Sequence, residues 1–515
     1  MRRSLGVLVV LVVLLVAGCA GPAAEGNATA PGEATTTPVS AIEPSTTAHP
    51  PDPTEDVLGW EDGYWYDESI AVASADGLNQ SELDAVVARG MARVEEIRRL
   101  EFERRVAVEV ISRSEYRERT NRTFGTPTTN ASLHQDVKFE ATFMMGESTS
   151  AIAQQESNRA AVALGQYSAA RDRILIISGN ETAPRMDEVT LAQELFHALQ
   201  ERHFNVSRYE VHTEETNNAV NGIVEGDANY VDHLYEQRCD GEWACVRPDP
   251  SGGSGGGKGD VHAGLLYLRY QPYSDGPVFV QERYEAGGWE AVNEVYEAPP
   301  RSTEQTIHPE KYRVDEPTNV TIEDRSTEEW AVPELGPGSV EYAAFGEAGL
   351  YVTLWYPSFV ETRASPGVRD VVIPYRDFYG PMYEPGIDQF DYAHRYTAGW
   401  DGDRLLPYVR NDSATTGETG YVWKTVWDTE ADAAEFLTGY EQLLEYHGAE
   451  PVVDRPGTYR IPEGEFADAF YVERNGTTVV IVNAPTVDEL ADVRAGSAPN
   501  ATVRSERGGF FAAGP

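Results

Sequence analysis

The segment Gln193-Glu194-Leu195-Phe196-His197 combines the residue types and the spacing best suited to chemistry. It follows an H-E-x-x-H motif in which Gln193 replaces the first histidine. In the intact motif, two histidines one helical turn apart bind zinc, and the glutamate beside the first acts as general base toward a zinc-bound water. Glu194 and His197 keep these places, so we interpret Glu194 as a candidate general base and His197 as a candidate metal ligand.

A second segment, Val224-Glu225-Gly226-Asp227-Ala228, offers Glu225 as another metal ligand, and its small residues would let two helices approach closely. Gln193 stands where the remaining ligand would be. Zinc prefers imidazole, thiolate or carboxylate, and a neutral amide oxygen is a poor replacement. The pattern therefore predicts weakened zinc binding, unless another group takes the place of the missing imidazole.

Three histidines elsewhere in the chain are candidates for that replacement: His233, His262 and His308. Helical spacing disfavours His233, because it lies roughly 80° around the helix from Glu225. Asp232 shares the face of Glu225 instead. The segment 302–312 would bring His308 toward a cleft or form a rigid loop, and its proline and polar residues are compatible with both.

A purely structural interpretation of the same residues is also open. In that interpretation the two helices are core elements, and His197 pairs with Glu225 in a buried polar contact. Neither a G-x-S-x-G motif nor a phosphate-binding glycine loop is present, so serine-hydrolase and nucleotide-binding functions have little support.

The elements that must position these residues are helices and a small sheet. Hydrophobic periodicity predicts a helix over 81–100, strands over 106–111 and 174–178, and helices over about 184–204 and 218–236. This order indicates an α+β core.

A glycine-rich run near 251–260 interrupts the core, and we interpret it as a flexible insertion, after which a helical pattern resumes at His262. Near the end of the chain, Asp428-Thr429 is typical of a helix cap, and that helix should run to about His447. Asn475-Gly476 predicts a hairpin turn between two strands. These signals indicate a small C-terminal α+β module.

The beginning of the chain has the features of an export signal. Met1-Arg2-Arg3 precedes an apolar run that ends at Val16-Ala17-Gly18-Cys19, and this run is too short to cross a bilayer as a helix. Cys19 is therefore predicted to carry lipid after cleavage, which makes the membrane a partner of the chain. We divide the chain into a signal peptide (1–18), a lipidated stalk (19–57), a core domain (58–410), a C-terminal module (411–500) and a tail (501–515).

Composition supports an exported protein of a salt-adapted cell. The formal net charge is −43, and the acidic residues are spread along the chain, which argues against nucleic acid as a partner and indicates dependence on salt screening. Of the three cysteines, Cys239 and Cys245 are left once Cys19 is assigned to lipid, so a disulfide between them is predicted. Repeated Asn-X-Ser/Thr sequons are compatible with a surface glycoprotein.

The two motif segments together resemble zinc metallopeptidases of the gluzincin type. The chain is similar, more closely, to a family of cell-surface lipoproteins of halophilic archaea with such a core. The segments that carry this resemblance are 58–66, 194–200, 225–228, 302–312 and 399–404.

The resemblance implies an α+β fold with a gluzincin-like helical core, a small sheet and a C-terminal module. It implies Glu194 as general base, His197 and Glu225 as metal ligands with Gln193 at the remaining ligand position, zinc as the cofactor, and a polypeptide substrate or ligand. We expect a lipid-anchored surface protein whose core is non-catalytic or altered in metal binding and binds polypeptide or envelope components. An active zinc metallopeptidase is the alternative.

Overall fold

The computed structural model describes residues 52–500, apart from 73–75, 125–126, 248–260, 365–369, 380–386 and 412–417. The expected signal peptide, Cys19, the stalk up to residue 51, the glycine-rich insertion and the tail lie outside the described residues. Helices and β-sheets both build the molecule, which confirms the α+β class. No helix in the described part of the chain is long and apolar enough to cross a membrane.

A small sheet and a long helix open the core. The helix α1 (Gln80–Arg98) starts at a capping box in which the Asn79 side chain accepts backbone hydrogen bonds and Glu82 reaches back to it. The sheet has the order β3 (Ala107–Ile111), β5 (Arg173–Ile177), β4 (Gly165–Ser168). β3 and β5 are parallel, whereas β4 runs antiparallel at one edge. The helix and the two strands predicted from the sequence are thus confirmed.

The two motif segments lie on α5 (Glu188–Phe204) and α6 (Glu214–Cys239). α5 begins later than the prediction near Pro184, because the Asp187 side chain caps it by accepting from the Val189 amide. The helices are antiparallel. Near the C-terminal end of α5, the Gln200 amide donates to the Val224 carbonyl at 2.7 Å, and near its start Glu188 accepts from the Tyr235 hydroxyl at 2.8 Å.

Further helices complete the core. They are α2 (Arg113–Phe124), α3 (Thr129–Glu140), α4 (Ala151–Val162), η1 (Val206–Arg208), α7 (Ala263–Leu268), α8 (Gln271–Glu297), α9 (Glu304–Ile307), η3 (Pro309–Lys311), α10 (Gly346–Ala364) and α11 (Tyr375–Phe378). α6 packs against α8 at two glycines. A Cβ atom on Gly226 would lie 2.6 Å from the carbonyl carbon and oxygen of Gly276, so the backbones touch only because both residues lack a side chain.

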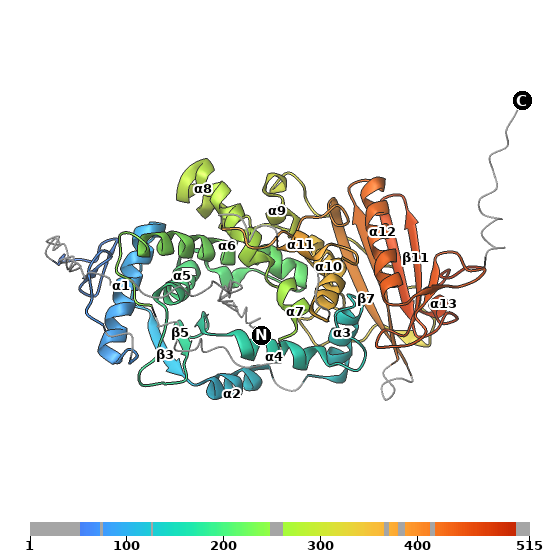
Figure 1. Ribbon diagram of the computed structural model, residues 1–515, viewed down its shortest axis with the longest axis horizontal. Helices are drawn as coiled ribbons and strands as arrows, with labels where there is room; N and C mark the ends of the chain where they lie inside the picture. Colours follow the sequence, from blue (N-terminus) through green and yellow to red (C-terminus); the bar gives the residue numbers. More distant parts are fainter. Residues whose placement is uncertain are drawn as a thin grey trace, which may run out of the picture.

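The C-terminal module is built on an antiparallel sheet of seven strands. Its order is β6 (Trp330–Ala331), β7 (Trp400–Arg410), β8 (Thr419–Trp427), β12 (Thr478–Ala484), β11 (Ala469–Asn475), β10 (Thr458–Arg460) and β9 (Glu450–Pro451). α12 (Glu430–Tyr446) lies across it, and the short α13 (Leu490–Val493) follows β12 (Figure 1). The predicted helix up to His447 and the hairpin at Asn475-Gly476 are both found, with Gly476 at φ 61°.

This sheet begins earlier in the chain than the module expected at 411–500. β7 pairs with β8 from Trp400 to Val409, so the boundary drawn at 410/411 separates two strands of the same sheet. β6 extends the sheet further back, to residues 330–331.

The sheet and the helical part share one hydrophobic core. The largest apolar cluster joins Phe139 of α3, Trp355 of α10, Trp423 of β8 and Phe436 of α12, all almost fully buried. A second cluster lies between α1, the small sheet, α5 and α6. Figure 1 shows α1, α5 and α6 toward one end of the long axis and the seven-stranded sheet toward the other.

Candidate functional site

The structure brings His197 and Glu225 together across the contact between α5 and α6. His197 Nε2 lies 3.4 Å from Glu225 Oε2. Gln193 lies one turn before His197 on the same face of α5, as helical spacing requires. All three side chains are buried, with exposed fractions of 0 % for Gln193 and Glu225 and 2 % for His197.

A chain of hydrogen bonds fixes the His197 ring. Its Nδ1 atom contacts Gln200 Oε1 at 2.7 Å, and the Gln200 amide nitrogen donates to the Tyr296 hydroxyl at 2.7 Å. Tyr296 in turn donates to Asp227 Oδ2 at 2.6 Å. Nε2 is therefore the ring nitrogen that faces Glu225.

Charges around His197 favour its protonated form. Burial opposes the charge on the ring, but Glu225, Glu194 and Gln200 outweigh it and raise the pKa of His197 to about 9. At neutral pH this shift favours the protonated form of the His197 ring, which faces Glu225.

Glu194 lies against the edge strand of the small sheet. The Tyr167 amide of β4 donates to Glu194 Oε2 at 2.6 Å, and a Cβ atom on Gly165 would lie only 3.2 Å from the Glu194 side chain. Glycine at position 165 therefore allows the strand to approach the carboxylate. Burial raises the pKa of Glu194 to about 7, against the opposing effects of His197 and the Tyr167 amide.

Several buried polar atoms at this site have no hydrogen-bond partner among the described residues. They are both amide atoms of Gln193, Oε1 of Glu194, Nε2 of His197, both carboxylate oxygens of Glu225 and Oδ1 of Asp232, although His197 Nε2 and Glu225 Oε2 face each other at 3.4 Å. Each such atom costs about 1–3 kcal/mol if it stays unpaired. All of these atoms belong to residues of α5 and α6.

The residues do not fit the zinc ion that the family resemblance implies. Groups of three His, Cys, Asp or Glu side chains with ligand atoms within 4.8 Å of one another occur elsewhere in the described chain, but none includes His197 or Glu225. Zinc sites of this kind need three protein ligands. Only two of them converge here, and the amide of Gln193 is a poor third.

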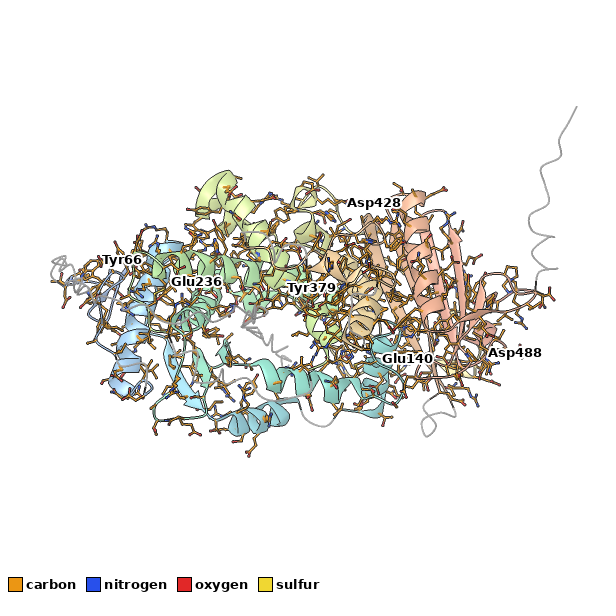
Figure 2. All side chains as sticks on the ribbon, viewed as in Figure 1. Tyr66, Glu140, Glu236, Tyr379, Asp428 and Asp488 are labelled. Atoms are coloured by element: carbon orange, nitrogen blue, oxygen red, sulfur yellow. A yellow bond between two sulfur atoms is a disulfide. The ribbon has the colours of Figure 1, made fainter. Side chains whose placement is uncertain are left out.

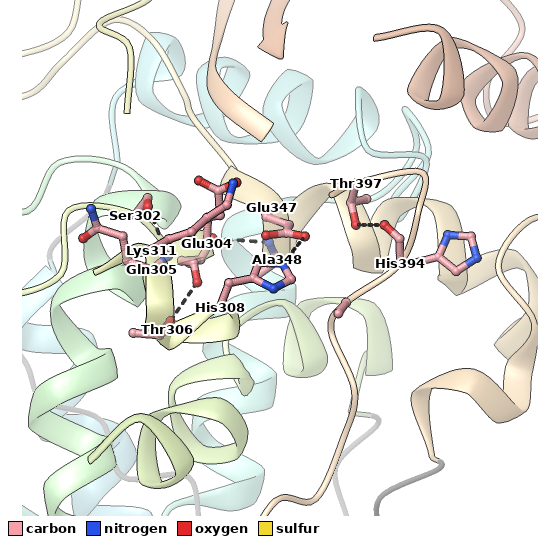
Figure 3. A network of polar contacts seen from close by, with 12 residues as sticks. Ser302, Glu304, Gln305, Thr306, His308, Lys311, Glu347, Ala348, His394 and Thr397 are labelled. Atoms are coloured by element: carbon pink, nitrogen blue, oxygen red, sulfur yellow. Dashed lines mark hydrogen bonds and ion pairs between the residues drawn. The ribbon is translucent and has the colours of Figure 1, made fainter. Parts of the chain in front are cut away.

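The candidate replacement histidines all lie in other contacts. His233 Nε2 contacts the Gln237 amide at 2.8 Å. His262 caps α7 and contacts the Met144 carbonyl at 2.9 Å. His308 Nε2 lies 3.1 Å from Glu347 Oε1 (Figure 3). None of the three reaches the site.

One of the acidic groups elsewhere surrounds a lysine. Glu304, Asp315 and Asp428 surround the ammonium group of Lys311, at 2.5, 3.0 and 3.0 Å. Figure 3 shows Lys311 beside Glu304 in this network. The segment 302–312 forms the short helical elements α9 and η3, and Lys311 connects it to Asp428, the residue that follows β8.

The other acidic group contains Glu140 of α3 and Asp468. Burial, together with the neighbouring Asp468 carboxyl, raises the pKa of Glu140 well above its usual value. Glu147 completes the group. Figure 2 labels Glu140 and Asp428, one from each acidic group, where the helical part meets the C-terminal sheet.

Sequence reasoning missed the arginines that hold α5 and α6. Arg98 of α1 contacts Asp227 at 3.0 Å, and Arg89 and Arg93 both contact Glu188 at 2.7 Å. All three arginine side chains are at most 1 % exposed. Their position within the apolar face of α1 was a usable signal, because a buried arginine requires a partner.

The predicted disulfide between Cys239 and Cys245 is present, with a Cα–Cα distance of 5.5 Å. It closes a short loop directly after α6. In this loop the Val246 amide donates to Glu188 Oε2 at 2.7 Å, so the disulfide lies next to the start of α5.

The match to a known family lies in the C-terminal part of the chain, outside the candidate site. Residues 333–494 match a family described as a domain of unknown function, DUF8575. The matched range contains α10 and most of the seven-stranded sheet, and it excludes α5 and α6. No curated protein and no solved structure matches the chain.

Proposed function

We propose that the chain is an exported surface protein, anchored by lipid on Cys19, whose metallopeptidase-like core does not act as a zinc peptidase and binds a polypeptide or envelope component. One observation carries the proposal. His197 and Glu225 meet as two metal ligands would, while Gln193 occupies the third position and no further ligand of the described chain converges there.

The contact between His197 and Glu225 lets α5 and α6 pack without metal. A zinc ligand must be a neutral imidazole, whereas Glu225 favours the protonated form of the His197 ring.

The edge strand β4 supports binding of an extended polypeptide. β4 pairs with β5 along one side, and the amide of Tyr167 points away from β5 toward Glu194. An edge strand offers backbone groups to which an extended peptide adds as a further strand, and a peptide added to β4 would have to take the Tyr167 amide from Glu194. The ligand would then lie beside the candidate site.

An active zinc metallopeptidase with Glu194 as general base is the second candidate. The observation that favours it is the pKa of Glu194, raised to about 7 by burial, because a general base works best when its pKa lies near the operating pH. The incomplete ligand set argues against it.

Metal content and peptide hydrolysis separate the two candidates. The chain, purified in molar salt without chelator, should contain no stoichiometric zinc by elemental analysis, and Glu194→Gln should leave any background hydrolysis of a denatured protein substrate unchanged. Gln193→His should raise zinc affinity at least about tenfold, because it restores an imidazole ligand. Stoichiometric zinc that His197→Ala removes, with hydrolysis abolished by Glu194→Gln, would establish the peptidase instead.

Anchoring is tested separately with Cys19→Ser. The variant should be found in the culture medium and the unaltered chain in the membrane fraction. Equal membrane association of both would contradict a lipid anchor on Cys19.

A further inference from the structure

Three carboxylates meet where α3 and the loop after it contact the C-terminal module. They belong to Glu140, the last residue of α3, to Glu147 in the loop, and to Asp468, which directly precedes β11. One oxygen atom from each residue lies within 4.8 Å of the other two. We infer that Glu140, Glu147 and Asp468 form a binding site for a calcium ion. This site is separate from the one between α5 and α6, so the inference does not depend on the proposed function.

The three carboxylates have no positive partner of their own. In the described part of the chain, no lysine, arginine or histidine forms an ion pair with any of them. The charged neighbours of Glu140 are acidic instead, and they include Asp136 as well as the other two members of the group. Around Lys311, by contrast, three carboxylates surround an ammonium group. A bound cation would supply the charge that the lysine supplies there.

The surroundings of Glu140 point to a ligand most directly. Its side chain is only 8 % exposed and faces the carboxyl group of Asp468. No amide, hydroxyl or basic group of the described residues donates a hydrogen bond to it. Asp468 is also buried, but the Asn483 amide donates to its Oδ2 atom at 2.9 Å. A buried carboxylate without a donor or a cation is costly, and a calcium ion would remove that cost.

Backbone packing holds the group in place. Gly146 lies so close to Glu465 that an added Cβ atom would be 2.3 Å from the Glu465 Cβ atom, and the Glu147 amide donates to the Glu465 carbonyl at 3.2 Å. The loop is therefore fixed against the segment that leads to Asp468. Glu140 ends α3, where the helix dipole is negative and favours a cation over a further carboxylate.

The donor atoms and their spacing favour calcium. Carboxylate oxygens are ligands of hard cations, and the group contains no nitrogen or sulfur donor that zinc would prefer. Calcium binds oxygens at about 2.3–2.6 Å, so two oxygens on opposite sides of the ion are about 4.6–5.2 Å apart. The separations here fit within that span. Because Glu147 is exposed, water can reach the ion and complete its coordination.

A calcium ion at this position would join two parts of the molecule. Asp468 lies within the range 333–494 that matches the domain of unknown function, whereas Glu140 and Glu147 lie before it. The three carboxylates meet only when the helical part and the C-terminal module are folded against each other. Calcium should therefore stabilise the folded chain in proportion to its binding, by mass action.

The test uses the full chain, freed of metal with chelator and then dialysed into molar KCl, which screens weak binding to exposed acidic side chains. Isothermal titration calorimetry follows the addition of Ca²⁺. We expect one Ca²⁺ per chain, and binding at least about tenfold weaker in Glu140→Gln and in Glu147→Gln, because each variant loses a carboxylate ligand. Ca²⁺ should also raise the melting temperature of the unaltered chain, and should raise those of the two variants less.

The matched control is Asp315→Asn, which removes one carboxylate from the group around Lys311 and should leave the Ca²⁺ affinity unchanged. Circular dichroism checks that each variant is folded. Without Ca²⁺, Glu140→Gln should be at least as stable as the unaltered chain, since it removes a buried charge beside Asp468. Glu147→Gln keeps the test decisive if Glu140→Gln does not fold, because Glu147 is exposed.

Saturable Ca²⁺ binding that both site variants weaken and Asp315→Asn keeps supports the inference. Absence of saturable binding below about 10 mM Ca²⁺, or binding that neither site variant weakens, overturns it and leaves a proton shared by Glu140 and Asp468 in place of the ion. Tighter binding of Mg²⁺ than of Ca²⁺ overturns the assignment to calcium. Stoichiometric zinc with hydrolysis that depends on Glu194 overturns the proposed function alone.

Discussion

Buried arginine contacts to two carboxylates, Asp227 on α6 and Glu188 on α5, lie near the candidate site. Arg98 contacts Asp227, which follows Glu225 by two residues, and Arg89 and Arg93 contact Glu188, which precedes Gln193 by five. Each arginine comes from α1. The residues between these contacts can therefore carry unpaired groups while the helices keep their spacing.

Arg98→Met should destabilise the chain by about 3–5 kcal/mol, because it leaves the buried Asp227 carboxylate without its positively charged partner. The neighbouring Arg99→Met is the control. Arg99 is 52 % exposed and pairs only with Glu96, so its loss should cost less than about 1 kcal/mol. Urea denaturation at constant salt measures both, and equal effects would contradict a dominant role of the buried contact.

Titration of His197 and Glu194 should lower the free energy of unfolding as pH rises. The folded-state pKa of His197 is raised to about 9, so its stabilisation is complete below about pH 6.5 and is lost as pH rises through about 9. The folded-state pKa of Glu194 is raised to about 7 from 4.5, so stability also falls between these two values. The chain should therefore resist urea better at pH 6 than at pH 9.5.

Glu225→Gln isolates the part of this effect that comes from His197. The variant should be less stable than the unaltered chain at pH 6, and the difference should shrink by up to a few kcal/mol toward pH 9.5, at about 1.4 kcal/mol per pKa unit. Urea denaturation with chelator present measures it. A difference that stays constant with pH would show that Glu225 does not stabilise the charge on His197.

Contacts at the site could be predicted from the sequence only where a local motif indicates both partners. The opposition of His197 and Glu225 was predictable, because the motif spacing and the small residues around Glu225 indicate two facing helices. Gln200, Tyr296 and Arg98 were not, since their contacts join residues far apart in the sequence. No local pattern indicates which distant residue a buried carboxylate such as Asp227 will meet.

At the scale of elements, the contact of α6 with α8 depends on the absence of side chains. Gly226 and Gly276 bring the two backbones together, and Gly226 lies between Glu225 and Asp227. The glycine contact and the site thus lie on adjacent faces of one helix turn. A displacement of α6 from α8 would change the position of Glu225 as well.

Gly226→Ala should destabilise the chain by about 1–3 kcal/mol, because its Cβ atom would lie 2.6 Å from Gly276 and force the helices apart. Alanine is otherwise the better helix former, so a gain would be expected if packing did not matter. Gly241→Ala, with no atom within 4 Å of the added Cβ, is the control and should be nearly neutral. Thermal unfolding followed by circular dichroism compares them.

Helices and hairpins could be predicted where the residues that determine them are close together in the sequence. Caps and periodicity indicated α1, α12 and the β11–β12 hairpin to within a few residues. The extent of the C-terminal sheet was not predictable in the same way. β7 joins it by pairing with β8 and β6, and such register depends on partners distant in the sequence.

At the scale of the whole molecule, a shared core is combined with a large negative charge. Apolar residues of α3, α10, β8 and α12 form one cluster, so the C-terminal sheet and the helical part are packed as a unit. The formal net charge of −43 acts against that compact state through repulsion between the acidic side chains.

The melting temperature should therefore rise as KCl increases from 0.1 to 2 M, because the screening length falls from about 10 Å at 0.1 M to about 3 Å at 1 M. Glycerol, which does not screen charge, serves as the comparison and should raise the melting temperature less. Differential scanning calorimetry gives both values. Equal effects of salt and glycerol would show that charge repulsion does not limit stability.

The buried arginine contacts of α1 also bear on how this chain can change over evolutionary time. A domain whose fold depends on its metal loses its structure when a ligand mutates, so selection holds every ligand position fixed. Here the contacts of Arg89, Arg93 and Arg98 secure α5 and α6 independently of any ion. A substitution at a position such as 193 should therefore leave the scaffold folded, so that such a site could change its ligand without loss of the fold.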